Sequence, residues 1–454
     1  MTQSTKIETT KNIEIKDINT NKSISKQLLK RKLSDLKDSD QSTILKNLND
    51  RTLSISSTDS EDLGDRLDQN SSSSSSDEED DQVEQKRKLE TDEEEPSSKK
   101  LKRSDSQTAV VIKSFDEPFF IDNNYPIPKL NDYEVLIENK YIGLNPVDWK
   151  GKKYRFGVYS FPWIQGRESS GVVHQLGPKV DNVSKGDEVF IASTSYRDLR
   201  TSTFQNFTIF DSRLIWKLPE VLSLKESCAI GVGLITAGSV IEELNVNLFD
   251  DKDFDQEKLL KKRDSILIWG GSSGVGSYII QLAKVAGFKK IITVASEKHN
   301  EFLTDLGATH ILDRFKSKDE LIKELTDIVP EGLQIGVDVV GKQTTDIVLE
   351  FLNINRSNPK ESPKTFVGVV SKPSKDIDES LLENIELKEV FIKKFHENVK
   401  FGEGLVSKTW ELLSQEKIKP QRNLKIYKGF EGILDGLKDL EKFGASNEKY
   451  IVEL

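Results

Sequence analysis

The sequence predicts an α/β protein in which a disordered tail is followed by a β-rich lobe and then by a doubly wound parallel sheet. Three observations predict this order. Aromatic residues are absent before Phe115 and frequent after it. Short strands separated by turn residues fill the next stretch, and from about residue 233 strands alternate with helices.

The first 107 residues differ in composition from the rest of the chain. They contain a single glycine, Gly64, and a single proline, Pro96, and they are rich in Ser, Lys, Asp and Glu. Such a segment cannot bury enough apolar surface to offset its conformational entropy. We therefore predict that residues 1–107 are disordered. The remaining residues, 108–454, are numerous enough for two lobes that share a cleft.

Two basic clusters lie near the end of the tail, at residues 86–88 and 99–103. Paired clusters of this kind are typical of a bipartite nuclear localisation signal, in which two cationic segments bind an acidic receptor groove. We predict a nuclear protein that binds an import receptor through residues 86–103. An ordinary charge run is the alternative. The acidic serine run at 71–81 is either a phosphorylated segment or a solvated spacer.

The composition also excludes several classes of protein. Cys228 is the single cysteine, so the chain has no internal disulfide and no zinc site built from several cysteines. No apolar run approaches the length of a membrane span, and the N-terminus has no apolar core, so we expect no membrane association and no secretory signal. A net charge of −10 argues against a surface that coats nucleic acid.

Residues 108–232 read as the β-rich lobe, with strands at 108–113, 133–138, 171–174 and 188–192. Residues 233–371 read as the doubly wound sheet. Its strands are expected at 266–269, 291–295, 310–312, 335–340 and 365–370. Its helices are expected at 275–286, before Gly307, at 318–329 and at 343–352.

The glycine-rich turn between the first strand and helix of this sheet is the most specific motif. It reads Gly271-Ser272-Ser273-Gly274-Val275-Gly276. A turn of this kind brings backbone N–H groups and a helix N-terminus to a pyrophosphate, which indicates a dinucleotide. We expect Gly271 to form the tight turn and Gly276 to let the helix pack on the strand. Ser273 replaces the middle glycine of the usual pattern, and a turn without a ligand is the alternative.

Five motifs in order show that residues 108–454 resemble the medium-chain dehydrogenase/reductase superfamily, closest to its zinc-free quinone-oxidoreductase-like and enoyl-reductase-like branch. They are Ile142–Asp148, Gly166–Val173, Gly186–Val189, Gly271–Gly276 and Val337–Gly341.

The resemblance implies a GroES-like catalytic lobe, a Rossmann domain, and a C-terminal segment, 372–454, that completes the Rossmann sheet and returns to the catalytic lobe. Relatives are often dimers, so a homodimer is one expected assembly. It also implies Val340 and Gly341 as cofactor-binding residues.

The resemblance also implies hydride transfer to a small hydrophobic carbonyl compound or quinone, without zinc. Zinc-dependent relatives hold the metal at positions that are here Asn145, Arg167 and Val232, and arginine cannot coordinate a cation. Polarisation of the substrate carbonyl must then be done by another group, or is not needed.

The cofactor is expected to be NADPH rather than NADH. NAD-binding proteins place an acidic residue at the end of the second strand, whereas this chain has Ser296 and Lys298, which suit a 2′-phosphate. Glu297 lies between them, and Ser296 could instead cap the next helix.

Three residues are candidates for the chemistry. Thr236 matches the residue that touches the nicotinamide in the family, with a helix-interior threonine as the alternative. Lys150 stands where some relatives carry a proton-donating tyrosine, and it is either a proton donor or a solvated lysine. Asn145 is expected to hold the cofactor or order its turn.

Two functions therefore remain open. One is an NADPH-dependent quinone or enoyl reductase located in the nucleus. The other is a non-catalytic nuclear regulator that senses NADPH while its tail binds partners. An aromatic cluster at 154–163 either lines a flat substrate pocket or packs in the core.

Overall fold

The computed structural model describes residues 106–246, 248–249, 264–341, 343–354 and 363–454. The predicted tail lies outside the described residues, apart from Ser106 and Gln107. These two residues begin the first strand, so the folded part starts two residues earlier than expected.

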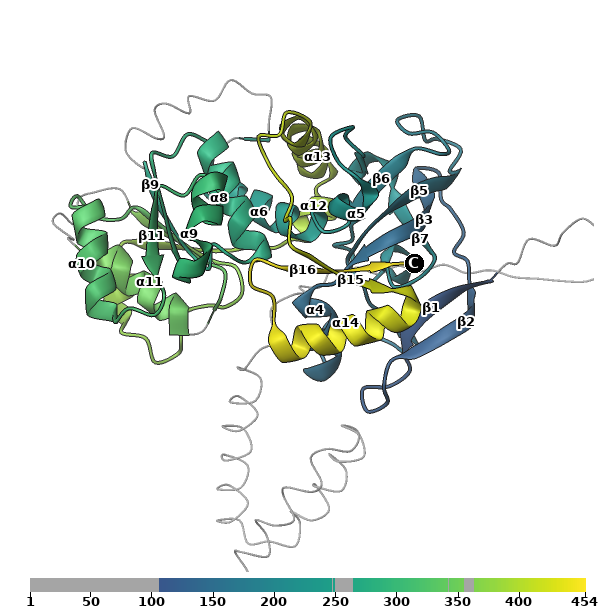
Figure 1. The fold of residues 1–454 in the computed structure, drawn as a ribbon, viewed down its shortest axis with the longest axis horizontal. Coiled ribbons are helices and arrows are strands. Elements are labelled where there is room, and N and C mark those ends of the chain that lie inside the picture. The colour runs from purple at the N-terminus through teal and green to yellow at the C-terminus, as the bar shows by residue number, and fades with distance from the viewer. Residues whose placement is uncertain (1–105, 247, 250–263, 342, 355–362) are drawn as a thin grey trace, which may run out of the picture. The chain divides into compact units, whose positions relative to one another are not determined.

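Within the described residues, the first lobe contains two sheets, which lie on the right of Figure 1. The larger is seven-stranded in the order β15-β16-β3-β5-β6-β8, and β7 also pairs with β3. The smaller is three-stranded in the order β2-β1-β4. The strands of both are β1 (Ser106–Ile112), β2 (Phe120–Pro126), β3 (Glu134–Gly143), β4 (Trp163–Ile164), β5 (Glu168–Leu176), β6 (Glu188–Ala192), β7 (Phe207–Asp211), β8 (Trp216–Lys217), β15 (Leu424–Lys428) and β16 (Lys449–Glu453).

The second lobe is a six-stranded sheet in the order β11-β10-β9-β12-β13-β14, and every neighbouring pair is parallel. Its strands are β9 (Ser265–Trp269), β10 (Lys290–Ala295), β11 (His310–Asp313), β12 (Ile335–Asp338), β13 (Lys364–Gly368) and β14 (Ile385–Glu389). This topology confirms the predicted doubly wound sheet beside a GroES-like lobe.

Helices cover both faces of the parallel sheet (Figure 1). Ile266 and Ile268 of β9 pack in the core beneath α8 and α9, whereas Leu267 and Trp269 pack in the core beneath α10 and α11. A strand buried on both sides reads as a continuous apolar run, as this one does. These helices are α8 (Gly274–Val285), α9 (Asn300–Leu306), α10 (Lys318–Ile328) and α11 (Gln343–Asn353).

The described residues form six further α-helices. They are α4 (Pro146–Lys153), α5 (Leu224–Ser227), α6 (Gly231–Glu243), α12 (Lys394–Glu397), α13 (Val399–Ser414) and α14 (Gly429–Phe443). Within the described residues, no helix combines the length and apolar character needed to cross a bilayer.

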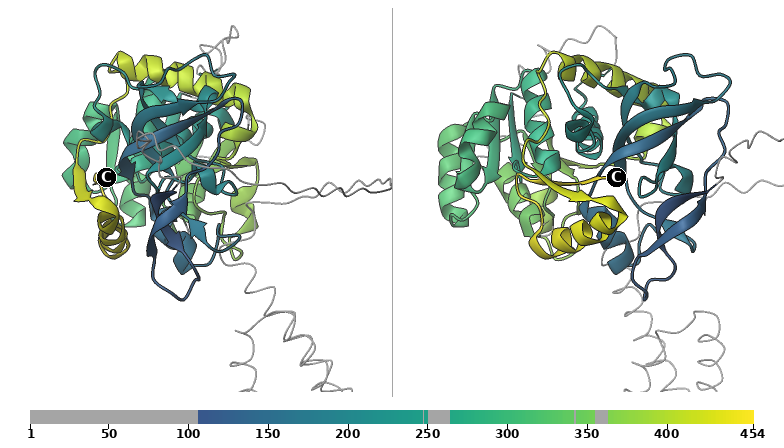
Figure 2. Two further views of the ribbon diagram at one scale, coloured as in Figure 1. Left: turned by 90° about the vertical axis from the view of Figure 1, so that its right-hand side faces the viewer. Right: turned by 45° about the vertical axis from the view of Figure 1, so that its right-hand side comes forward.

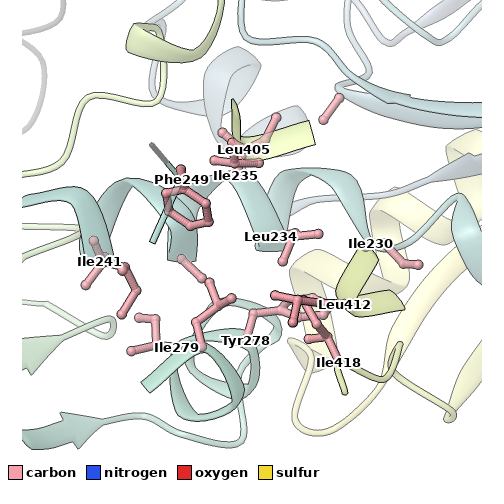
Figure 3. Packing of buried hydrophobic residues seen from close by; sticks show 14 of the residues in the cluster. Ile230, Leu234, Ile235, Ile241, Phe249, Tyr278, Ile279, Leu405, Leu412 and Ile418 are labelled. Atoms are coloured by element: carbon pink, nitrogen blue, oxygen red, sulfur yellow. The ribbon is translucent and has the colours of Figure 1, made fainter. Parts of the chain in front are cut away.

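Helix α6 joins the two lobes. Its apolar residues Leu234 and Ile235 lie between Tyr278 of α8 and Leu405 of α13, and Ile230, at its N-cap, belongs to the same buried cluster (Figure 3). A side chain at Gly233 would lie 2.9 Å from the carbonyl oxygen of Gly274, so the start of α6 lies against the start of α8. Because these residues form one buried core, the start of α6 keeps the glycine-rich turn beside the catalytic lobe.

The C-terminal elements return to the first lobe, as both views in Figure 2 show for the yellow segment. Strand β16 pairs antiparallel with β3 and parallel with β15. The loop before β16 contacts the other lobe, because the backbone N–H of Asn447 donates to the carbonyl oxygen of Ser272 at 2.9 Å. The last strand therefore links the nucleotide turn to the catalytic lobe.

Candidate active site

The glycine-rich turn is shaped by three glycines, one of which the sequence motif did not include. Gly270 has φ +94°, so it is the left-handed residue of the turn, a role that we expected of Gly271. Gly271 is needed for another reason, since a Cβ there would lie 2.1 Å from Oγ1 of Thr293 on β10. A Cβ at Gly276 would lie 2.3 Å from the carbonyl oxygen of Gly270. The backbone of α8 therefore packs directly against the backbone of the turn that follows β9, as we expected from the glycine at position 276.

The beginning of α8 is open on one side. Ser273 caps the helix, and its Oγ accepts from the N–H of Gly276 at 3.0 Å. Ser272, Ser273, Gly274 and Val275 are all half-buried. A Cβ at Gly274 would meet only the far end of Gln421, at 3.9 Å. Nothing in the protein requires a glycine at this position, so the free space fits the close approach of a phosphate to the helix N-terminus.

Cationic groups gather where β10 and β11 end. Ser296 stands at the N-cap of a short helix, Glu297–His299, but its side chain makes no capping hydrogen bond, which removes the alternative role that we considered. Lys298 is exposed. Burial, together with the charges of Lys298 and Arg314, lowers the pKa of His299, so both cations lie close to this ring. Arg314 was not singled out from the sequence, because its position after β11 carries no motif.

The predicted contacts of Val340 and Gly341 are constrained by Asp338. The buried carboxylate of Asp338 accepts from the N–H of Val340 at 2.9 Å and from the N–H of Gly341 at 3.0 Å. Their amides are therefore already used within the protein. The Val340 side chain is 52% exposed and is the part of this pair that can contact a ligand.

Asn145 belongs to a buried polar network with Glu168 and Lys449. Asn145 Nδ2 donates to Glu168 Oε1 at 2.9 Å, and the N–H of Val232 donates to Glu168 Oε2 at 2.8 Å. Lys449 Nζ donates to Asn145 Oδ1 at 2.8 Å and forms an ion pair with Glu168 Oε1. Lys449 was not predicted from the sequence, because it lies 281 residues from Glu168 along the chain and only the fold brings the two together.

Asp148 and Arg167 are buried beside this network. Asp148 Oδ2 accepts from the N–H of Asn145 at 2.8 Å. Burial raises the pKa of Asp148 to about 7, against the opposing effect of the Arg167 charge. Burial also lowers the pKa of Arg167, whose guanidinium carbon lies 4.1 Å from the ring centre of Tyr196.

Thr236 and Lys150 occupy different environments. Thr236 is buried in α6, and its Oγ1 donates to the carbonyl oxygen of Val232 at 2.7 Å, as a helix-interior threonine does. Lys150 lies in the last turn of α4, half-buried, with Nζ 5.8 Å from the ring centre of Trp149. Thr236 is thus connected to Glu168 through the backbone of Val232, which hydrogen-bonds to both. No described hydrogen bond connects the Lys150 side chain to that network.

The aromatic cluster divides between core and surface. Trp163 is 2% exposed and belongs to the core, whereas Tyr154, Tyr159 and Phe161 are each about half exposed. Tyr159 lies next to the loop that carries Tyr196, because the Arg197 guanidinium carbon lies 4.9 Å from the centre of its ring. The core interpretation therefore holds for Trp163, and the substrate-pocket interpretation stays a prediction for the exposed rings.

The residues at the metal positions of zinc-dependent relatives do not fit a cation. The amide of Asn145 is engaged by Glu168 and by the ammonium of Lys449, and Arg167 carries a positive charge of its own. No group of three or more His, Cys, Asp or Glu side chains suited to a metal occurs in the described part of the chain. We derive no catalytic step through a metal.

Comparison with known proteins gives the same assignment for both lobes. Residues 131–220 match the alcohol dehydrogenase GroES-like domain, and residues 274–357 match the family described as zinc-binding dehydrogenase.

Two curated relatives illustrate the similarity. The trans-enoyl reductase tndF of Aspergillus flavipes is 28% identical over 340 residues, which are 72% of this chain and 94% of that protein. The uncharacterized protein YCR102C of Saccharomyces cerevisiae is 31% identical over 283 residues, which are 56% of this chain and 74% of that protein.

Solved structures share the fold. The quinone oxidoreductase of Pseudomonas syringae pv. Tomato DC3000 has a TM-score of 0.62 at 17% identity, covering 77% of this chain and 100% of that one. Mycobacterial Rv1454c complexed with NADPH has a TM-score of 0.61 at 20% identity, with the same coverage.

Proposed function

Because the chain belongs to the medium-chain dehydrogenase/reductase superfamily, in its zinc-free quinone-oxidoreductase-like and enoyl-reductase-like branch, we propose that it uses NADPH to reduce a quinone or a carbon–carbon double bond conjugated to a carbonyl. Relatives named as trans-enoyl reductases and quinone oxidoreductases support an oxidoreductase. The observation that carries the cofactor part is the open cradle at Gly274, where a side chain would fill space that the protein itself leaves free.

The bound cofactor supplies a hydride, and the protein binds and orients both reactants. The N-terminus of α8, with Ser272, Ser273, Gly274 and Val275 between Gly271 and Gly276, would hold the diphosphate. Thr236 and Asn145 would line the nicotinamide end, where the Glu168 network fixes the start of α4. Lys150 is the candidate for returning a proton to the reduced acceptor.

The preference for NADPH rests on charge at the end of β10. Ser296 has a hydroxyl that does not cap the helix, and Lys298 and Arg314 both lie near His299. A 2′-phosphate at this place would receive a hydroxyl hydrogen bond and two positive charges, whereas a ribose hydroxyl would gain little from them. The NADPH bound by mycobacterial Rv1454c supports a nicotinamide cofactor in this fold.

The test is a fluorescence titration of the purified full-length chain with NADPH and with NADH, followed by NADPH oxidation with quinones and enones. We expect tighter binding of NADPH, and we expect Lys298→Ala and Arg314→Ala to weaken NADPH binding while leaving NADH binding unchanged. Lys438→Ala, on the exposed face of α14, is the control. Tighter binding of NADH would contradict the assignment of Ser296 and Lys298, as would variants that weaken both cofactors equally.

The same assay separates the enzyme from the regulator. Uptake of NADPH with no oxidation by any acceptor would favour a non-catalytic sensor. Oxidation that depends on the acceptor concentration would favour the reductase.

Nuclear localisation is a further part of the proposal, and it is supported by the two basic clusters at residues 86–103. Replacing the lysines and arginines of either cluster by alanine should move a fluorescently tagged chain from the nucleus to the cytoplasm. An unchanged distribution after both clusters are replaced would contradict it.

A further inference from the structure

Arg167 is the most unusual buried group in the described part of the chain. The residue is 2% exposed, yet its Nε and Nη1 have no hydrogen-bond partner among the described residues. Its one described hydrogen bond is a long one, from Nη2 to Gln165 Oε1 at 3.3 Å. Leaving a buried charged donor unpaired costs more than leaving a neutral one unpaired, so these two N–H groups call for an acceptor.

Neighbouring side chains do not provide that acceptor. Asp148, the carboxylate whose charge raises the pKa of Arg167, uses Oδ2 to accept from the backbone of Asn145, and its Oδ1 has no partner among the described residues. Tyr196 contributes the face of its ring. Gln165 accepts only from Nη2, so the site holds a cation whose Nε and Nη1 donors are unused.

The location of Arg167 connects it with the chemistry. It directly precedes Glu168, whose carboxylate accepts from the N–H of Val232 at 2.8 Å. The carbonyl oxygen of Val232 accepts from Thr236 at 2.7 Å, and the following residue, Gly233, lies against Gly274 of the nucleotide turn. Arg167 is therefore at the catalytic-lobe side of the contact between the two lobes, and it stands at a position where zinc-dependent relatives carry a metal ligand.

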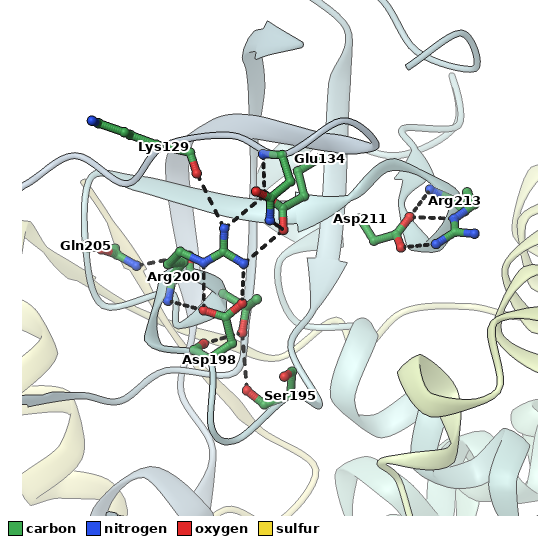
Figure 4. A network of polar contacts seen from close by, with 10 residues as sticks. Lys129, Glu134, Ser195, Asp198, Arg200, Gln205, Asp211 and Arg213 are labelled. Atoms are coloured by element: carbon green, nitrogen blue, oxygen red, sulfur yellow. Dashed lines mark hydrogen bonds and ion pairs between the residues drawn. The ribbon is translucent and has the colours of Figure 1, made fainter. Parts of the chain in front are cut away.

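The loop that covers Arg167 is firmly anchored. Arg200, four residues after Tyr196, pairs with Asp198 at 2.7 Å and with Glu134 of β3 at 2.9 Å (Figure 4). Tyr196 as a residue is half-buried, and its ring covers one face of the guanidinium. We expect an acceptor to displace this ring, while the Arg200 network keeps the rest of the loop in place.

We propose that Arg167 binds the carbonyl oxygen of the acceptor through one of its unpaired N–H groups, and that its positive charge stabilises the negative charge that this oxygen gains, in the place of a metal. The inference rests on the proposed function. In an enone, the β-carbon accepts the hydride of NADPH, which becomes NADP⁺, and the double-bond electrons move toward the oxygen to form an enolate. The α-carbon then takes a proton from the Lys150 ammonium, the proton donor of the proposed function, to give the saturated ketone. A fixed, charged donor at the developing oxyanion would lower this barrier.

The direct test uses the wild-type chain with NADP⁺, which cannot reduce the acceptor, and 4-phenyl-3-buten-2-one labelled with ¹³C at the carbonyl. Hydrogen bonds to the oxygen weaken the carbonyl bond, so we expect the infrared band of the bound ketone to move to lower wavenumber than in buffer. A bound ketone whose band stays at its position in buffer would overturn the proposal without any variant.

Substitution provides a second readout. We expect Arg167→Gln to return the band toward its free position and to lower kcat by roughly 10²–10³-fold, the usual loss for an oxyanion donor, with the Kd for NADPH unchanged. Arg167→Lys keeps the charge but replaces the rigid guanidinium by a flexible ammonium with a shorter reach, so it should show a smaller band shift and a reduced kcat. Arg213→Gln is the matched control, since Arg213 is an exposed arginine of the first lobe that pairs with Asp211, and it should behave as wild type.

The outcomes also separate this inference from the proposed function. Wild type that binds NADPH but reduces no 4-phenyl-3-buten-2-one, trans-2-hexenal or 1,4-naphthoquinone contradicts both. Wild type that reduces them, together with Arg167 variants that keep the full band shift and rate, contradicts the role of Arg167 alone. If Arg167→Gln does not fold, the wild-type band and Arg167→Lys decide the question.

Discussion

Asp148 shows how one buried carboxyl can make the whole fold sensitive to pH. It lies at the start of α4 with no exposed surface, and burial is the largest cause of the rise in its pKa from 3.8 to about 7. A carboxyl whose pKa is higher in the folded than in the unfolded chain stabilises the fold while it is protonated. That contribution is complete below about pH 4 and is lost as the pH rises to about 7.

Replacing Asp148 by asparagine should remove this dependence. The amide oxygen can still accept from the N–H of Asn145, so the start of α4 is kept. We expect the free energy of unfolding of wild type to fall, relative to Asp148→Asn, by a few kcal/mol between pH 4 and pH 7, at roughly 1.4 kcal/mol for each unit of pKa difference.

Urea unfolding of both proteins at several pH values measures this difference. Other groups that titrate in the range, such as His299 and His396, are common to both proteins and cancel. If the free energies of unfolding of the two proteins depend on pH in the same way, the pKa of Asp148 does not differ between the folded and the unfolded chain.

Predictability at the level of single residues depends on sequence distance. The close packing at Gly276 follows from local pattern, and the positions of Asn145 and Arg167 follow from family motifs, whereas the capping hydrogen bond of Ser273 was not predicted. Lys449 and Arg314 could not be predicted, because each reaches the site through strand pairing that no local signal specifies. The left-handed residue at Gly270 was missed because the usual motif begins one residue later.

At the scale of elements, Gly274 and Gly276 of α8 are both glycine, but for different structural reasons. A Cβ at Gly276 would meet backbone atoms of Gly270 at 2.3 Å, which cannot move aside. A Cβ at Gly274 would meet no atom closer than 3.9 Å. One glycine therefore serves the fold, and the other leaves room for a ligand.

Alanine at each position separates these roles. Gly276→Ala should lower the free energy of unfolding by about 1–3 kcal/mol through overpacking. Gly274→Ala should leave stability unchanged or raise it by up to about 1 kcal/mol, because alanine favours helix, while it raises the Kd for NADPH about tenfold or more. Thermal unfolding and NADPH titration of both variants make the comparison. Unchanged NADPH binding by Gly274→Ala would show that no phosphate approaches this side of α8.

Strands and helices of the parallel sheet were predicted closely, because buried strands and capped helices have strong local patterns. The predicted strand at 291–295 differs from β10 by one residue, and the predicted helix at 318–329 differs from α10 by one residue. Strands β14, β15 and β16 were not predicted individually. The residues of β14 and β15 are largely half-buried or exposed, as in Ile385–Glu389, so the alternation that marks a strand is weak in both.

At the scale of the whole molecule, the last strand closes the catalytic lobe around a buried charge. Lys449 on β16 pairs with Glu168 on β5, and Glu168 has no exposed side-chain surface. β16 also pairs with β3, so the ion pair and the strand ladder hold the C-terminal segment at the same place. Breaking a buried ion pair from one side leaves a charge without compensation, which is costlier than removing both partners.

Lys449→Met should therefore lower the free energy of unfolding by about 3 kcal/mol, the lower end of the usual range for a broken buried pair. The double variant Lys449→Met with Glu168→Gln should recover part of this loss, because the amide keeps an acceptor for the N–H of Val232 and carries no charge. Lys438→Met removes an exposed pair with Asp435 and should change nothing measurable. Urea unfolding of wild type, Lys449→Met, Glu168→Gln, the double variant and the Lys438→Met control tests the coupling. If the double variant is as unstable as the sum of its single substitutions predicts, the two side chains are not energetically linked, and strand pairing alone holds the C-terminal segment to the catalytic lobe.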